Sequence, residues 1–196
     1  MPGLTARVVR LRTIVSTARR VASAVALIVS LGLARPGEAA EGEKSLSVGL
    51  DYSAWSVDQP DHPGTDHDSI TAQGAGVAAD YLYGWNDSFW LRASLHGGYH
   101  AVPDGSAWSA GGTIGLRYAF DVLRYVPYGE IGLGALAIGG DGVYSEVRPV
   151  VELGLGLDVL EGRTWSWGVV AHFDGTYSQA VFFTIGPRVS WRWGFF

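Results

Sequence analysis

The stretch HFDGTYS, residues 172–178, contains the three side-chain types of a hydrolytic triad. In a triad, histidine takes the proton of a serine hydroxyl while a carboxylate orients the imidazole. His172 and Asp174 are two residues apart, so they share one face of an extended segment. Ser178 lies four residues further on, where no spacing rule aligns its hydroxyl with the histidine. The pattern favours a structural role, and no catalytic residue is predicted.

Two other groups carry side chains that bind metal ions. The stretch 58–68 holds Asp58, Asp61, His62, Asp66, His67 and Asp68. Because their spacing matches no metal-binding motif, we interpret this stretch as a solvated acidic loop. His96 and His100 are too far apart to share one ion, at about 13 Å along a strand. No metal site and no cofactor is predicted.

The N-terminal residues predict an export signal. Arginines precede the apolar run VASAVALIVSLGL, residues 21–33, and small residues follow at Ala39 and Ala40. This order is typical of a secretory signal peptide. The apolar run is shorter than the roughly 20 residues that span a bilayer as a helix. We expect residues 1–40 to be a cleaved signal peptide and residues 41–196 to form one domain.

The charge of residues 41–196 argues against a nucleic-acid partner. Residues 1–40 hold six of the 14 bases and one of the 19 acids, so 8 bases and 18 acids remain. A chain with a net charge of about −10 is poorly suited to neutralise phosphates. Lys44 is its one lysine, although lysine normally helps to solvate the surface of a soluble protein. The chain has no cysteine, which excludes a disulfide framework.

Residues 41–196 alternate between an apolar row and a row of small or charged residues, which predicts strands. The eight alternating segments are 45–56, 68–83, 88–102, 107–121, 125–138, 147–160, 164–175 and 181–195. Tight turns at 84–87, 121–124 and 161–163 alternate with longer loops at 57–67, 102–107, 139–146 and 176–180. This arrangement predicts an all-β fold, an eight-stranded antiparallel up-and-down transmembrane β-barrel with both termini at the tight-turn end.

The alternation also fits a soluble barrel with an apolar interior. Glycine is frequent in the charged row, where it would weaken a solvated strand but would suit a crowded lumen. The apolar row carries four tryptophans, at positions 165, 167, 191 and 193, which are too bulky for the interior of eight strands. Together with the shortage of lysine, these observations favour an apolar row that faces lipid.

Aromatic residues gather at the strand ends. The tight-turn end has Tyr81, Tyr83, Trp85, Phe89, Tyr118, Phe120, Tyr125, Trp165, Trp191, Trp193 and Phe195. A smaller set near the loops has Tyr52, Trp55, Tyr99, Trp108, Phe173 and Phe183. Two such bands predict the aromatic girdles of a membrane barrel.

If the apolar row faces lipid, the charges of the other row are enclosed and need partners. The expected interior charge network is Asp80, Arg92, Arg117, Glu130, Glu152, His172, Arg188 and Arg192. Counting outward from the tight turns places Asp80 opposite Arg92, Arg117 opposite Glu130, and Glu152 opposite His172, close enough to pair. Asp51 is expected to reach Arg188 or Arg192 across the closing seam. We therefore expect a packed polar plug and no open pore.

Residues 41–196 resemble the small eight-stranded outer-membrane barrels of Gram-negative bacteria, of the outer-membrane protein A, X and W kinds. The resemblance rests on the signal peptide, the eight strands, the girdles and the terminal Phe196. It implies an outer-membrane monomer in contact with outer-membrane lipid and lipopolysaccharide. It also implies that Phe196 is read by the barrel-assembly machinery, although the lipid-facing row here ends on Phe195. Lipid-A-deacylating barrels carry a His-x-Ser motif where this chain has HFD, so no catalytic residues carry over.

These features predict a structural or surface-interaction role. One alternative is a narrow channel for small apolar solutes, which would need a lateral opening or an apolar inner funnel. A lipid-modifying enzyme is a further alternative, which would need His172, Asp174 and a serine to converge at the outer rim.

Overall fold

The computed structural model describes residues 42–58, 69–103, 105–120, 124–141, 143–176 and 180–194. The predicted signal peptide lies outside this range, as do Phe195 and Phe196 and most of the acidic loop, so the predictions made for them stay predictions. In the described part of the chain, no helix is long and apolar enough to cross a membrane.

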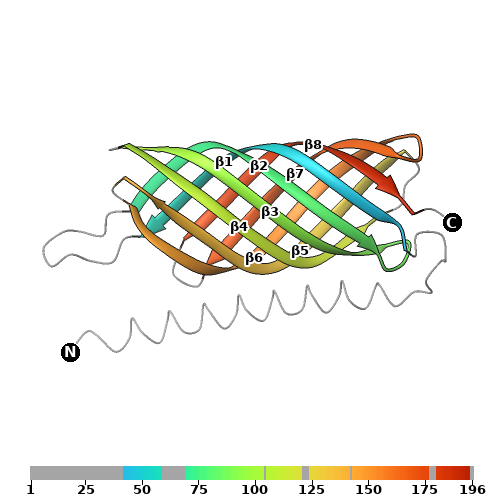
Figure 1. The fold of residues 1–196 in the computed structure, drawn as a ribbon, viewed down its shortest axis with the longest axis horizontal. Helices are drawn as coiled ribbons and strands as arrows, with labels where there is room; N and C mark the ends of the chain where they lie inside the picture. Colours follow the sequence, from blue (N-terminus) through green and yellow to red (C-terminus); the bar gives the residue numbers. More distant parts are fainter. Residues whose placement is uncertain are drawn as a thin grey trace, which may run out of the picture. The chain divides into compact units, whose positions relative to one another are not determined.

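Eight antiparallel strands close into one barrel (Figure 1). They are β1 (Lys44–Asp58), β2 (Ser69–Gly84), β3 (Phe89–Val102), β4 (Gly105–Ala119), β5 (Tyr125–Gly140), β6 (Val143–Glu161), β7 (Trp165–Thr176) and β8 (Val181–Trp193). Each strand pairs with its neighbours in sequence, and β8 pairs back to β1, which closes the sheet into a barrel. The predicted all-β class and eight-stranded up-and-down topology are confirmed.

Two of the predicted loops are largely strand. β4 already begins at Gly105, inside the predicted loop 102–107. In the predicted loop 139–146, β5 continues to Gly140 and β6 begins at Val143. The polar residues there had suggested loops, yet backbone pairing between the strands continues through them. The β5–β6 register shifts between Ile138 and Gly140, where Gly140 takes a positive φ of 147°. A glycine at this bulge adopts a conformation that other residues rarely reach.

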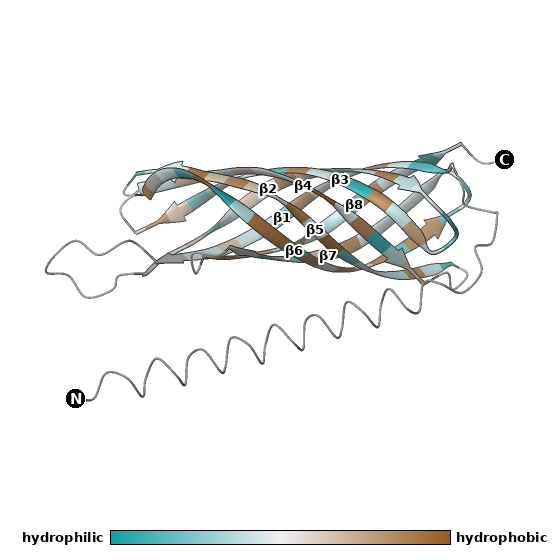
Figure 2. Ribbon diagram, turned by 90° about the horizontal axis from the view of Figure 1, so that it is seen from below, coloured by the Kyte–Doolittle hydropathy of each residue, from teal (hydrophilic) through white to brown (hydrophobic). Residues whose placement is uncertain are grey.

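The apolar row covers the outer wall. Leu95, Ile114 and Leu155 are 70%, 72% and 73% exposed. Figure 2 shows hydrophobic and hydrophilic positions alternating along the strands. Proteins in water rarely carry apolar surface this continuous. A barrel with an apolar outer wall and a polar interior is built to be surrounded by lipid.

Most predicted girdle residues lie on this outer wall. Tyr81, Tyr83, Trp165, Trp191 and Trp193 are all exposed, and Trp165 stacks on Trp191 with ring centroids 5.7 Å apart.

The placement of Trp55 in the loop-end girdle is wrong. Its side chain is 2% exposed and stacks on Phe182 inside the barrel, with ring centroids 5.5 Å apart. Trp55 is three residues from the exposed Tyr52, and residues an odd number apart in a strand face opposite sides.

Candidate functional site

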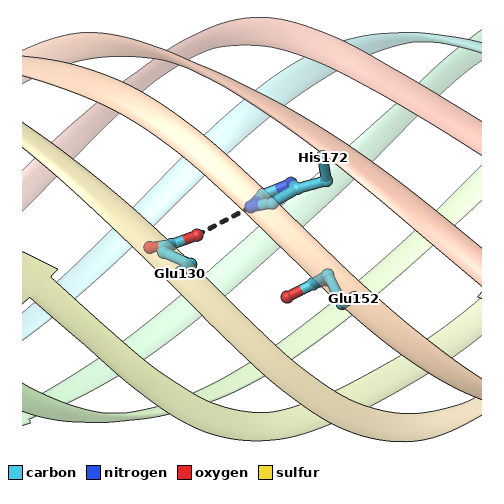
Figure 3. A group of neighbouring side chains, drawn as sticks. All are labelled: Glu130, Glu152 and His172. Atoms are coloured by element: carbon cyan, nitrogen blue, oxygen red, sulfur yellow. Dashed lines mark hydrogen bonds and ion pairs between the residues drawn. The ribbon is translucent and has the colours of Figure 1, made fainter. Parts of the chain in front are cut away.

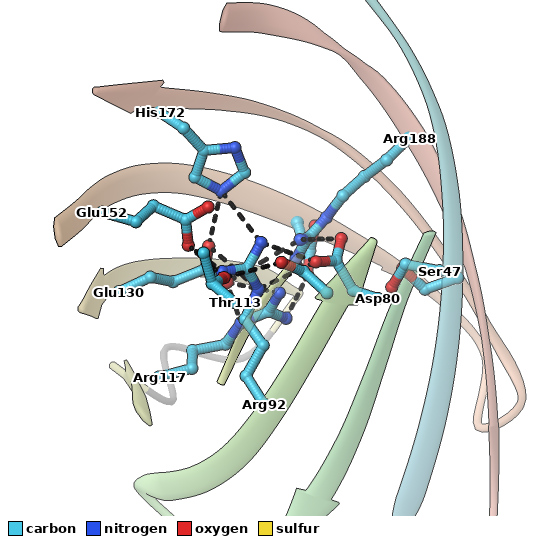
Figure 4. Close-up of polar contacts among 12 residues, drawn as sticks. Ser47, Asp80, Arg92, Thr113, Arg117, Glu130, Glu152, His172 and Arg188 are labelled. Carbon is cyan, nitrogen blue, oxygen red and sulfur yellow. Dashed lines mark hydrogen bonds and ion pairs between the residues drawn. The ribbon is translucent and has the colours of Figure 1, made fainter. Parts of the chain in front are cut away.

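The middle of the lumen holds a cluster of charged side chains (Figure 4). Its members are buried and come from seven strands, β2 to β8: Asp80, Arg92, Arg117, Glu130, Glu152, Asp158, His172 and Arg188, here called the charge cluster. Seven of the eight were among the predicted interior charges. Asp158, which lies in the same inward row, was missed as a member.

Arg92 on β3 lies at the centre of the charge cluster. Its Nε donates to Asp80 Oδ1 at 2.8 Å, and its terminal nitrogens bind both Asp80 and Glu152. Nε also lies 3.6 Å from Glu130 Oε2. On the far side, His172 Nε2 is 3.4 Å from an Arg92 terminal nitrogen. The Arg92 guanidinium therefore contacts carboxylates on three strands, β2, β5 and β6.

Asp80 and Arg92 meet diagonally. β2 runs to Gly84, and the bends after it occupy residues 85–88, one position later than predicted. Arg92 therefore faces Leu82, and Asp80 faces Ser94. Long side chains still bridge this diagonal, because such neighbours lie about 7–8 Å apart.

The expectation that Glu152 faces His172 is wrong for the same reason. β6 reaches Glu161, and the turn that follows begins at Gly162, whose φ is 79°. Glu152 consequently faces Asp174, and His172 faces Gly154. A turn that starts one residue later changes each cross-strand partner by two residues.

Glu130 on β5 bonds to side chains from β4 and β7. Arg117 lies directly opposite, and its Nε donates to Glu130 Oε1 at 2.5 Å. The other oxygen, Oε2, lies 2.8 Å from His172 Nε2 (Figure 3). Gly154 separates Glu130 from His172 in the strand register, and a Cβ there would approach His172 Cδ2 at 2.6 Å. The glycine leaves room for side chains two strands apart to bond.

The same arrangement recurs at Gly168. Asp158 and Arg188 flank it on β6 and β8, and Arg188 donates two hydrogen bonds to Asp158, at 3.1 and 2.7 Å. A Cβ on Gly168 would lie 2.3 Å from Asp158 Oδ1. Glycine in the inward row thus permits charged side chains to reach across an intervening strand.

The Tyr128 ring contacts two of the arginines. The Tyr128 ring centroid lies 4.3 Å from Arg117 Cζ and 4.5 Å from Arg188 Cζ. The ring covers Gly156, where a Cβ would meet the phenol oxygen at 1.9 Å. Each guanidinium gains a cation–π contact with the ring.

Arg192 lies at the tight-turn end, away from the charge cluster. Its Nε is 2.9 Å from Glu43 Oε1, and its guanidinium lies 5.6 Å from the Trp90 ring centroid. Burial raises the pKa of the Glu43 carboxyl just before β1, and the positive charge of Arg192 opposes this shift. A cavity of about 30 Å³ beside Arg192 is lined also by Arg117 and Asp158. Such a volume holds about one or two water molecules.

Asp51 forms no ion pair with Arg188 or Arg192, which corrects the seam prediction. The β1–β8 register places Gly49 opposite Arg188 and Ser45 opposite Arg192. Asp51 therefore lies two residues closer to the loops than Gly49, the residue opposite Arg188. Arg188 instead forms an ion pair with Asp158.

The loop end of the lumen is mostly apolar. Its buried side chains are Trp55, Ala72, Ala107, Leu136, Ile138, Val150, Ala180 and Phe182, here called the apolar layer. Below it, His100 is bound by Ser53 Oγ at 3.3 Å and Ser109 Oγ at 2.8 Å. The sequence had suggested a polar inner row throughout. Most inward positions at this end are apolar, although Arg148 and Glu146 form an ion pair on β6, opposite Leu136 and Ile138.

The residues weighed for catalysis do not form an accessible site. His172 and Asp174 are 7% and 3% exposed and face the lumen. Nε2 of His172 is taken by Glu130. Ser178 lies outside the described residues.

No protein-family profile matches this chain, and no curated protein matches it. Solved structures do match in fold. They include the outer membrane protein OprG from Pseudomonas aeruginosa, at a TM-score of 0.61 and 11% identity over 80% of this chain and 98% of that one. Neisserial surface protein A matches at a TM-score of 0.55 and 12% identity, over 77% of this chain and 99% of that one. Ail, the attachment invasion locus protein of Yersinia pestis, matches at a TM-score of 0.53 and 17% identity, over 78% of this chain and 99% of that one. At these identities the likeness shows the fold, that of small eight-stranded outer-membrane barrels.

Proposed function

We propose that this chain is an outer-membrane barrel with a closed lumen, and that it has a structural or surface-interaction role. The observation that carries the proposal is the double closure of the lumen. The charge cluster crosses its middle, and the apolar layer fills its loop end. A barrel filled in this way offers its wall and loops to other molecules, and offers no passage through its centre.

The contacts of the charge cluster support a plug. Arg92 on β3 reaches Glu152 on β6 and His172 on β7, which belong to the far side of an eight-stranded ring. Glu130 links the same two sides through Arg117 and His172. Side chains fill the interior of a barrel of this size unless it holds a small ligand.

The orientation and partners follow from the barrel type. We propose that the tight-turn end and both termini of the barrel face the periplasm and that the loops face outward. The wall would contact outer-membrane lipid and lipopolysaccharide as a monomer, and Phe196 would guide the barrel-assembly machinery. The acidic balance of residues 41–196 gives no reason to expect a nucleic-acid partner.

Cell fractionation followed by refolding of residues 41–196 tests this placement. We expect the chain in the outer-membrane fraction, and we expect the denatured protein to recover its strands only in detergent or lipid. Recovery of a folded, detergent-free periplasmic species would contradict the membrane placement.

A channel for small apolar solutes is the second candidate, and two observations favour it. The apolar layer gives the loop end of the lumen the apolar side chains that such a channel would need. The β1–β8 pairing is interrupted at Leu50 and Asp51, near Pro187, which has no N–H to donate. A side opening at this seam would let a solute leave without passing the charge cluster.

A reversible disulfide between β1 and β8 distinguishes the two functions. Ser47 and Ser190 face each other across β1 and β8, with their hydroxyl oxygens 2.7 Å apart. Replacing both with cysteine adds the chain's one disulfide, because the chain has no cysteine of its own. The closed-lumen proposal predicts no uptake of a small apolar solute into liposomes in either redox state. Uptake that appears on reduction and stops on oxidation would favour the channel.

A further inference from the structure

The tight-turn end of the outer wall carries a group of neighbouring aromatic side chains, here called the aromatic patch. Its members are Tyr81, Tyr83, Trp165, Trp191 and Trp193, and each is exposed. Trp165 stacks on Trp191, and the ring centroid of Trp193 lies 6.4 Å from those of Trp191 and Tyr81. The aromatic patch therefore extends from β7 over the β8–β1 seam to β2.

Lys44, the one lysine of the chain, lies within the aromatic patch. The register places it between Tyr83 on β2 and Trp193 on β8. Its side chain faces outward, because its neighbours Glu43 and Ser45 are buried and successive residues of a strand alternate between the two faces. Lys44 is half-buried, as expected for a stem that lies along the apolar wall and carries its ammonium to the lipid–water boundary.

Lys44 has no acidic partner in the described part of the chain. Among the same residues, no ion pair reaches Arg163, which is exposed in the turn two residues before Trp165. Arg124 is also exposed at the tight-turn end, but it pairs with Glu161. The aromatic patch is therefore flanked by two uncompensated positive charges on an otherwise acidic barrel.

An anionic phospholipid matches this surface. The lysine ammonium is a compact charge with three N–H donors, which suits the phosphate oxygens of a headgroup. Tyrosine and tryptophan favour the same depth of a bilayer, where the ring meets the acyl chains and the O–H or N–H meets the headgroup. Leu46 and Val48 continue the exposed apolar wall along β1, where the acyl chains would lie.

We propose that Lys44, Tyr83 and Trp193 form a binding site for one phospholipid whose headgroup carries a net negative charge. The Lys44 ammonium binds the phosphate, the two flanking rings pack against the lipid below the headgroup, and Arg163 adds positive potential at the β7 end. This inference rests on the proposed membrane placement, with the tight-turn end in the periplasmic leaflet. Lipopolysaccharide belongs to the opposite leaflet, so the ligand here is a phospholipid.

Native mass spectrometry of the refolded barrel tests the site. Residues 41–196 are refolded in detergent and incubated with equal amounts of phosphatidylglycerol and phosphatidylcholine of the same acyl chains, and the retained lipid is counted. We expect one phosphatidylglycerol per barrel, with a preference of about fivefold over phosphatidylcholine from the attraction of one basic residue. Lys44→Gln should lose this preference, and Lys44→Arg should retain it because it keeps the charge.

Arg124→Gln is the matched control, because it removes an exposed cation at the same end that Glu161 already neutralises. It should keep the preference. Equal retention of the two lipids by the parent, or equal losses in Lys44→Gln and Arg124→Gln, would overturn the proposal. Circular dichroism separates this proposal from the membrane placement. A barrel that folds in detergent but shows no headgroup preference contradicts the lipid site alone, whereas a chain that folds without detergent contradicts the placement.

Discussion

The charge cluster and the apolar layer both fill the lumen, but they do so by different physical means. In the charge cluster, each buried charge needs a particular partner in a particular place, and glycines such as Gly154 and Gly168 provide the space. In the apolar layer, side chains such as Trp55 and Phe182 need only apolar neighbours of suitable volume. Electrostatic pairing is intolerant of change, whereas apolar packing absorbs changes that conserve volume.

The largest effect is expected at the centre of the charge cluster. Arg92→Leu leaves Asp80 and Glu152 enclosed without their cation and should lower the free energy of unfolding by about 3–5 kcal/mol. Urea unfolding in detergent micelles, followed by tryptophan fluorescence, measures the change.

Arg124→Leu is the control for this variant. It removes an exposed arginine that pairs with Glu161 at the tight-turn end, and the free energy of unfolding should change little. If Arg92→Leu does not fold, Arg92→Lys should fold with reduced stability because it keeps the charge. Equal costs for Arg92→Leu and Arg124→Leu would contradict the importance of the charge cluster.

A smaller loss is expected when the space in the charge cluster is filled. Gly154→Ala places a methyl group 2.6 Å from His172 Cδ2 and 3.0 Å from Glu130 Oε2, which forces the two side chains apart. Overpacking of this kind costs about 1–3 kcal/mol. Gly175→Ala on β7 is the matched control, because nothing lies within 4 Å of its added Cβ. Equal unfolding midpoints for the two variants would show that the glycine does not serve the Glu130–His172 contact.

The smallest effect is expected in the apolar layer. Phe182→Leu keeps an apolar side chain of similar volume against Trp55 and should cost about 1 kcal/mol. The same unfolding assay measures it. Phe182→Asp is the contrasting change, since it puts a charge against the Trp55 ring in place of an apolar side chain and should prevent refolding. Ready refolding of Phe182→Asp would show that the loop end of the lumen is hydrated.

The sequence predicted the strands and the outward face because both depend on alternation along the chain. It predicted the partner of Arg117 because the β4–β5 register is the one expected from the sequence. It missed the partner of Glu152 because the turn after β6 starts one residue later. The contact between Arg92 and Glu152 could not be predicted, since it depends on which strands face each other across the closed barrel. Trp55 could have been assigned inward from its odd spacing to Tyr52.

Ion conductance across a planar lipid bilayer tests the closed lumen most directly. Residues 41–196, refolded and inserted at low density, are expected to give no resolved current steps, because the charge cluster and the apolar layer leave no continuous path. Arg92→Leu with Phe182→Ala, which weakens both layers, is expected to give transient openings if it folds. Stable, uniform current steps from the unaltered barrel would contradict the account.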